Sequence, residues 1–184
     1  MPFVPDVPPE AFPVELRYAV TSPDGETCRT ANIFHKLVHS PAVFSALADV
    51  TAVTLSKLKL DPVLRELAIC TATRLTGGAY PHDRHIQLAL SIGVDQAKLL
   101  ALPAYRGHPV FSEEEQAVIA FAEELTQRAE ISPAVQERLG QFLDFQERVE
   151  LAWTVSFYCA VARLTSACEV PVETTTPKGN ALRR

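Results

Sequence analysis

The sequence predicts an all-α protein of about seven to eight helices, and three observations carry that prediction. Capping residues stand directly before prolines at several places, and such pairs mark the first residues of helices. Apolar residues recur with the spacing of an amphipathic helix, as they do from Val118 to Leu125. The alternation of apolar and polar residues that is typical of strands is not found between turn signals.

The expected helices follow one another from residue 30 to residue 167. Their ranges are 30–38, 41–57, 62–75, 81–92, 95–102, 113–130, 133–143 and 146–167. Three of them begin with a capping side chain followed by proline, at Ser40-Pro41, Asp61-Pro62 and Ser132-Pro133. Ser112 and Glu115 have the spacing of a capping box, and Asp95 can cap the helix that follows Gly93.

The composition is that of a globular domain with a mildly acidic surface. The chain has 184 residues, a net charge of −5, 47% hydrophobic and 21% charged residues, which excludes a disordered chain. Nucleic acids and anionic membranes favour clustered Lys and Arg, so neither is expected as a partner. The longest apolar run, from Leu151 to Ala162, is too short to cross a bilayer. The start lacks a signal-peptide pattern and the four cysteines form no C-x-x-C pair, so a cytoplasmic protein with reduced thiols is expected.

Proline positions divide the chain into three parts. Five of the 14 prolines lie among the first 13 residues, so residues 1–29 are expected to form an extended, Pro-rich arm. Residues 30–168 form the helical domain, and the polar residues 169–184 form a tail. The helix over 149–164 is apolar around nearly its whole girth and needs partners on all sides, which predicts burial between subunits.

Side chains that can carry chemistry concentrate between Glu66 and His85. Glu66 and Cys70 share one face of the helix over 62–75, among apolar residues. A carboxylate in that setting is costly unless it is paired or reaches a polar cavity. Glu66 is therefore either a functional group or a surface residue that pairs with Arg65 or another cation.

The segment after that helix has the features of a ligand site. Gly77-Gly78 ends the helix, and His82 and His85 lie three residues apart near the start of the next one. The positive end of a helix disfavours imidazolium, so these histidines are expected to be neutral proton acceptors. Glycines and the N–H groups at a helix start favour an anionic ligand such as a substrate carboxylate. The alternative for His82 is an exposed first-turn residue, and two histidines are too few for zinc, so no metal is expected.

The stretch LDPVLRELAICTATRLTGGAYPHDRHIQLALSIGV, from Leu60 to Val94, resembles the central motif of the carboxymuconolactone decarboxylase and alkylhydroperoxidase D-like superfamily. ANIFHKLVHSPAVFSAL resembles the family's leading helices, FSEEEQAVIAFAEEL the helix after the motif, and VELAWTVSFYCAVARLTSA its final helix. The similarity covers residues 30–168. It implies an all-α fold assembled as a homo-oligomer (dimer, trimer or hexamer) with helices packed between subunits.

The resemblance also bears on the chemistry. Thiol-active members carry a Glu, a C-x-x-C pair and a His, and Glu66 and His85 stand at the matching outer positions. Gly78 and Pro81 occupy the two cysteine positions, so the dithiol peroxidase cycle has no chemical route at this site. The run from His85 to Gly93 resembles the decarboxylase branch, which opens or decarboxylates small acidic lactones without metal or organic cofactor.

Residues and resemblance together predict a cofactor-independent enzyme for decarboxylation, ring opening or isomerisation of a small organic acid, lactone or carbonyl compound. His85 is expected to transfer the proton, Glu66 to orient it, and Tyr80, which stands where the decarboxylases have a His, to act as a second donor. The residues expected to bind substrate are His82, Arg163, Gly78 and Cys70. Two alternatives are open: a peroxiredoxin-like reductase that uses a single thiol such as Cys70, and a non-catalytic protein that binds a ligand or only assembles.

Overall fold

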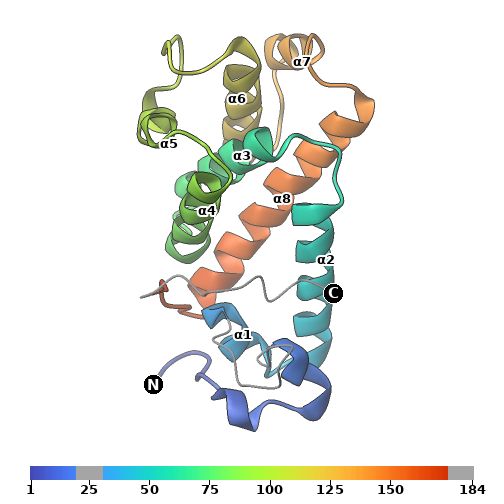
Figure 1. The fold of residues 1–184 in the computed structure, drawn as a ribbon, viewed down its shortest axis with the longest axis vertical. Coiled ribbons are helices and arrows are strands. Elements are labelled where there is room, and N and C mark those ends of the chain that lie inside the picture. Colours follow the sequence, from blue (N-terminus) through green and yellow to red (C-terminus); the bar gives the residue numbers. More distant parts are fainter. Residues whose placement is uncertain (20–30, 174–184) are drawn as a thin grey trace. The chain divides into compact units, whose positions relative to one another are not determined.

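The computed structural model describes residues 1–19 and 31–173, and within them the chain has eight α-helices, three short 3-10 helices and no strand (Figure 1). The all-α prediction is confirmed, and each expected helix occurs with ends that differ by a few residues at most. The chain forms two compact units, one of Leu58–Leu164 and one of Met1–Lys57 with Thr165–Arg184.

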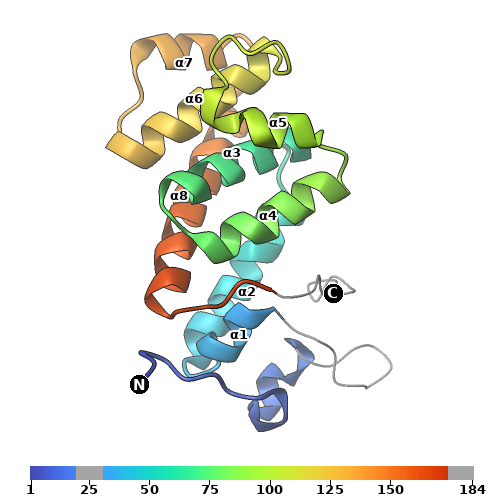
Figure 2. The same cartoon turned by 90° about the vertical axis from the view of Figure 1, so that its left-hand side faces the viewer.

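The larger unit carries the helices that hold the site. Their bounds are α3 Pro62–Leu75, α4 Ala79–Ser91, α5 Gln96–Ala101, α6 Glu113–Arg128, α7 Pro133–Leu139 and α8 Phe145–Ala167, with a 3-10 helix, Leu102–Ala104, after α5. α3 packs against both α4 and α6 (Figure 2). One apolar core joins α3, α6 and α8, where Leu67, Ile119 and Leu151 are completely buried. α3 is thus the central helix of this unit.

Helix starts in this unit follow the capping chemistry that the sequence predicts. The side chains of Asp61, Asp95, Ser112 and Ser132 each accept a hydrogen bond from a backbone N–H in the first turn that follows. Ser112 and Glu115 form both bonds of the capping box. Each cap satisfies an N–H that has no partner within the helix, and such a cap typically contributes about 1 kcal/mol.

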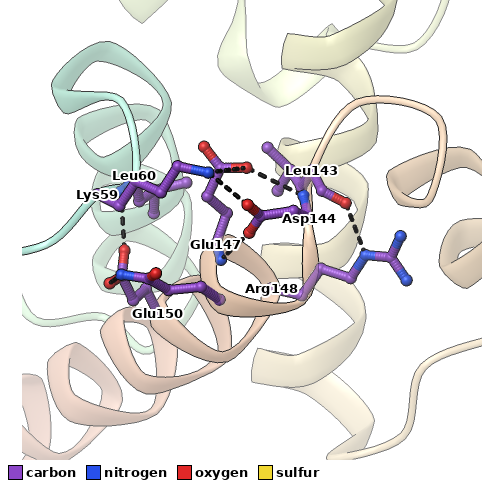
Figure 3. A network of polar contacts seen from close by, with 8 residues as sticks. Lys59, Leu60, Leu143, Asp144, Glu147, Arg148 and Glu150 are labelled. Carbon is purple, nitrogen blue, oxygen red and sulfur yellow. Dashed lines mark hydrogen bonds and ion pairs between the residues drawn. The ribbon is translucent and has the colours of Figure 1, made fainter.

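The start of α8 is a second capping box, one that the sequence analysis did not identify (Figure 3). Asp144 accepts from the N–H of Glu147 at 3.0 Å, and Glu147 accepts from the N–H of Asp144 at 3.0 Å. Lys59 forms ion pairs with both carboxylates, and its hydrogen bond to Asp144 lowers the pKa of that carboxyl. Glu150 accepts from the N–H of Leu60 at 2.8 Å. These contacts connect the segment before α3 to the first turns of α8.

The smaller unit contains α1, Asn32–Leu37, and α2, Pro41–Ser56. The sequence predicts an extended arm over residues 1–29, but Pro9–Ala11 and Val14–Ala19 form 3-10 helices, because the φ angle that proline imposes also fits a 3-10 turn. Ser40 is the N-cap residue and α2 begins at Pro41, as predicted, but the side chain of Ser40 makes no capping hydrogen bond. Residues 20–30 of the arm and 174–184 of the tail lie outside the described residues.

The N-terminal segment is held against α1 by side chains of that helix. His35 and Lys36 donate hydrogen bonds to the carbonyl oxygens of Val7 and Val4, both at 2.8 Å. Lys36 also forms an ion pair with Asp6 at 3.2 Å. The first residues are therefore part of the folded unit rather than a free extension.

α8 is buried on one face only. Leu151, Val155 and Tyr158 point into the core, whereas Phe145 and Val149 are 81% and 69% exposed. The sequence predicts a helix buried on all sides, and within a single chain this helix retains an exposed apolar face. No helix in the described part of the chain is long and apolar enough to cross a membrane.

Candidate functional site

The candidate site begins with a hydrogen bond between α3 and α4, which run side by side (Figure 2). Glu66 lies in the middle of α3 and is completely buried, and His85 lies in the second turn of α4 and is 7% exposed. Nδ1 of His85 is 2.7 Å from Oε2 of Glu66. A buried carboxylate that holds an imidazole in this way is a common arrangement where proteins transfer protons.

Arg65 completes the pairing of Glu66. Its Nε donates to Oε1 of Glu66 at 3.1 Å, and Arg65 is itself only 5% exposed. The expected pairing with Arg65 is present, but Glu66 is buried and is not a surface residue; one carboxylate oxygen contacts Arg65 and the other contacts His85. A buried carboxylate is costly without a cation, and Arg65 supplies that cation beside Glu66.

His82 is bonded to α3 as well. Its Nδ1 lies 3.2 Å from Oγ1 of Thr73, and the ring is half-buried. Burial lowers the pKa of His82, the charges of Arg74 and His85 act in the same direction, and a hydrogen bond to the backbone of Cys70 opposes them. The shift agrees with the neutral histidine that the sequence predicts, although burial rather than the helix end is its main cause.

The turn between the two helices depends on its glycines. Gly77 has a φ of 70° with nothing within 4 Å of an added Cβ, so it serves the backbone conformation. Gly78 has an ordinary φ of −77°, but a Cβ there would lie 2.5 Å from the Cβ of Ala162 on α8. Gly78 thus allows close packing of the turn against α8 rather than the approach of a ligand.

Three tyrosines of this unit are buried, and two of them, Tyr80 and Tyr158, lie in α4 and α8. The ring of Tyr158, on α8, contacts that of His85 edge-on, with centroids 4.4 Å apart and planes at 75°. Tyr80, in the first turn of α4, is buried. Thr73 shares the helix face of Glu66 at i+7 and could be found from the sequence, whereas no local signal places Tyr158 or Ala162 near this turn.

Arg163 lies on the exposed side of α8, where its guanidinium donates to the carbonyl of Cys159 in the same helix at 3.2 Å. No described contact joins it to Glu66, His82 or His85. The structure brings together Glu66, His85 and His82 around α3, and it does not bring Arg163 to them.

The described cysteines are all buried and unpaired. Cys70 has no exposed surface, and burial raises the pKa of its thiol strongly, with the negative charge of Glu66 acting in the same direction. Cys159 and Cys168 are buried free thiols, and Cys28 lies outside the described residues. Among residues 1–19 and 31–173, no three His, Cys, Asp or Glu side chains gather as a metal-binding group.

Part of the chain matches a known family. Residues 41–124, which include α3 and α4, match the carboxymuconolactone decarboxylase family. Over these residues the match agrees with the carboxymuconolactone decarboxylase and alkylhydroperoxidase D-like resemblance that the sequence motifs indicate. Among curated proteins, none matches the chain in sequence.

Solved structures share the fold at low sequence identity. A peroxidase-related protein with an alkylhydroperoxidase AhpD core, from Ralstonia eutropha JMP134, has a TM-score of 0.78 at 16% identity and covers 92% of this chain and 91% of its own. A protein of unknown function from Agrobacterium tumefaciens that carries the name of the antioxidant defence protein AhpD has a TM-score of 0.71 at 19% identity, with coverage of 76% and 96%. A cysteine-to-alanine variant of the debrominase Bmp8, in complex with 2,3,4-tribromopyrrole, has a TM-score of 0.72 at 16% identity, with 79% of each chain covered.

Proposed function

We propose that this chain is an enzyme that acts without a cofactor, by general acid/base chemistry, on a small lactone, organic acid or carbonyl compound. The observation that carries the proposal is the 2.7 Å hydrogen bond between the buried side chains of Glu66 and His85. The reaction class is decarboxylation, ring opening or isomerisation, each of which needs a proton to be moved next to a carbonyl group.

Each residue of the group has a distinct role in this proposal. His85 accepts the substrate proton at Nε2, because Nδ1 is engaged by Glu66. Glu66 fixes the orientation of the ring and stabilises the imidazolium that forms, as carboxylates do in related arrangements. Arg65 donates a hydrogen bond to the other carboxylate oxygen of Glu66, and Tyr80 is the candidate for returning a proton. Positioned proton transfer of this kind contributes about 10²–10⁴-fold in rate.

Thiol chemistry is less well supported. The sequence contains no C-x-x-C pair, and the raised pKa of the Cys70 thiol opposes formation of the thiolate that peroxide reduction requires. The space in which a side chain at position 78 would lie is filled by Ala162. The solved neighbours named for peroxidase or debrominase activity share the fold, and their chemistry is not carried over to this chain.

Turnover of a substrate panel tests the proposal. The full chain is incubated with carboxymuconolactone, simple unsaturated lactones and β-keto acids, alongside the variants His85→Asn and Glu66→Gln. We expect loss of about 10²–10⁴-fold in kcat for His85→Asn, with melting temperatures and circular dichroism confirming that the variants fold. His39→Asn and Glu130→Gln are the matched controls, since both side chains are exposed and remote in sequence from the site. Full activity in both site variants would overturn the mechanism, and the absence of turnover of every substrate by the wild type would favour a binding or assembly role.

A further inference from the structure

The two imidazoles on α4 are held in a defined tautomer by their partners on α3. This inference rests on the proposed function, because it takes the surroundings of His85 as the place where substrate binds. The hydrogen-bond partners of the two rings determine whether each ring can accept a hydrogen bond from the substrate.

At His85 the partner is a carboxylate. Arg65 donates to one oxygen of Glu66, which is the geometry of an ionised carboxylate in a buried ion pair. An ionised carboxylate can only accept, so Nδ1 of His85 carries the hydrogen that points at Oε2. In the neutral ring Nε2 is therefore a hydrogen-bond acceptor.

At His82 the partner is a hydroxyl whose own hydrogen is engaged. Oγ1 of Thr73 lies 2.7 Å from the carbonyl oxygen of Ile69, which can only accept, so the hydroxyl donates there. The 3.2 Å contact between Oγ1 and Nδ1 of His82 must then be donated by the ring. Nδ1 of His82 carries the hydrogen, and Nε2 is again the acceptor.

The two acceptors belong to one helix face. His82 and His85 are three residues apart on α4, and the charge of His85 acts on His82. The hydrogen bonds from the two rings to side chains of α3 are both made at Nδ1, and the ring of His82 also bonds the backbone of Cys70, whose carbonyl oxygen can only accept.

The two imidazoles themselves offer an anion no hydrogen at Nε2 in these tautomers. Burial lowers the pKa of His82, so this ring is neutral near pH 7. Pro81 has no N–H, which removes one donor from the first turn of α4. Arg74 is the cation that acts on His82; its charge also acts on Glu123 on α6, and its Nε is buried without a hydrogen-bond partner among the described residues. A substrate carboxylate bonded directly to Nε2 of either ring, as the sequence predicts for His82, does not fit these tautomers.

We propose that His82 and His85 together accept hydrogen bonds from an uncharged substrate that presents two neighbouring O–H or N–H groups, as an enediol or a catechol does. One imidazole removes the proton that moves in the reaction, and the other accepts a hydrogen bond that orients the molecule. Of the substrate classes in the proposed function, enolisable carbonyl compounds and hydroxylated lactones fit these acceptors, and a carboxylate at the imidazoles does not.

The tautomers can be measured directly. Long-range ¹H–¹⁵N NMR spectra of the ¹⁵N-labelled full chain near neutral pH should show, for both rings, a protonated Nδ1 and an unprotonated Nε2. Thr73→Val is the matched variant, because it removes the acceptor at His82 and leaves Glu66 in place; it should raise the Nε2–H fraction of His82 only. A protonated Nε2 on either ring of the wild type overturns the inference.

Three aromatic probes of similar size test the ligand class. Catechol offers two neighbouring O–H donors, 1,2-dimethoxybenzene offers acceptors only, and benzoate offers a carboxylate. Catechol should bind in calorimetry and shift both Nε2 signals, with an affinity at least about tenfold above that of the other two, since an unmet donor or acceptor costs more than 1 kcal/mol. Equal or tighter binding of benzoate, or no binding of catechol at millimolar concentration, contradicts the inference.

The outcomes separate this inference from the proposed function. Turnover that depends on His85 together with a protonated Nε2 would reject the donor-binding inference and retain the enzyme. The expected tautomers and catechol binding without turnover of any substrate would reject the enzyme and retain the binding site.

Discussion

A Cβ atom on Gly78 would lie 2.5 Å from the Cβ of Ala162, so the turn between α3 and α4 packs against α8 only because residue 78 has no side chain. Its neighbour Gly77 has open space around it and is needed for its φ of 70°. Two adjacent glycines thus meet different requirements, one of packing and one of backbone conformation. Gly78, which is needed for packing, stands at the position where the resemblance places a cysteine in thiol-active relatives.

Substitution of Gly78 should therefore destabilise the protein through overpacking. We expect Gly78→Ala to lower the free energy of unfolding by about 1–3 kcal/mol. Ala162→Gly alone should cost about 1 kcal/mol, as glycine does inside a helix, and the double variant should regain part of the loss. Urea unfolding measures all three. Gly77→Ala is the control, because the backbone strain that it introduces should not be relieved by Ala162→Gly. If the losses of unfolding free energy caused by Gly78→Ala and Ala162→Gly simply add in the double variant, the two positions do not contact each other as the structure indicates.

The ion pair of Arg65 with Glu66 should be strongly coupled. Arg65→Met leaves a buried carboxylate without its cation and should cost about 3–5 kcal/mol. With Glu66→Gln, a double-mutant cycle should give a coupling of about 1–3 kcal/mol. The pair of Lys98 with Glu115, whose side chains are 24% and 9% exposed, is the comparison and should give less than about 1 kcal/mol. Equal coupling in the two pairs would show that burial does not determine the strength of the first.

The Cys70 thiol should be unreactive in the folded protein. Burial and the charge of Glu66 raise its pKa, so little thiolate forms at neutral pH. Iodoacetamide labelling followed by peptide mass spectrometry should modify Cys70 only after denaturation. Rapid modification of Cys70 in the native protein would support the single-thiol alternative. So would peroxide reduction by the wild type that is lost in Cys70→Ala.

The sequence predicts the helices of this protein better than it predicts the contacts of the candidate site. Pro62, Asp61 and the Ser112–Glu115 pair define helix starts through local chemistry, and the structure confirms them. The 3-10 helices near the N-terminus were missed because the φ angle of proline suits both extended chain and tight turns.

The site contacts depend on tertiary packing that no local pattern encodes. Glu66 and His85 can be selected as a pair from their helix positions and the family resemblance, but their hydrogen bond depends on how α3 and α4 pack. Tyr158 and Ala162 reach this region from a helix much later in the chain. Arg163 is exposed because of how α8 is turned about its own axis. The sequence of α8 is apolar on nearly all sides, so it does not determine which face of the helix is buried.

The lowered pKa of His82 makes stability depend on pH. In the unfolded chain His82 has a pKa of about 6.5, and in the folded chain a lower one, so below about pH 6.5 the unfolded state binds more protons. Stability is therefore fully present above that pH and falls as the pH drops toward the folded pKa. Between about pH 7.5 and about pH 5.5, the wild type should lose more unfolding free energy than His82→Gln does. His39→Gln, which replaces an exposed ring, should lose as much as the wild type; an equal loss in His82→Gln would contradict the role assigned to burial.

Tyr158 should act as a positioning residue for His85 through its ring rather than its hydroxyl. The edge-on contact, with centroids 4.4 Å apart, limits rotation of the imidazole, and burial raises the pKa of the phenol, which makes its hydroxyl a weaker acid. Tyr158→Phe keeps the ring contact and should retain kcat, whereas Tyr158→Leu loses it and should lower kcat by about 10–100-fold with little change in KM. A Tyr158→Phe variant as inactive as Tyr158→Leu would assign the hydroxyl a direct role in the reaction. Equal activity in all three proteins would mean that Glu66 alone positions His85.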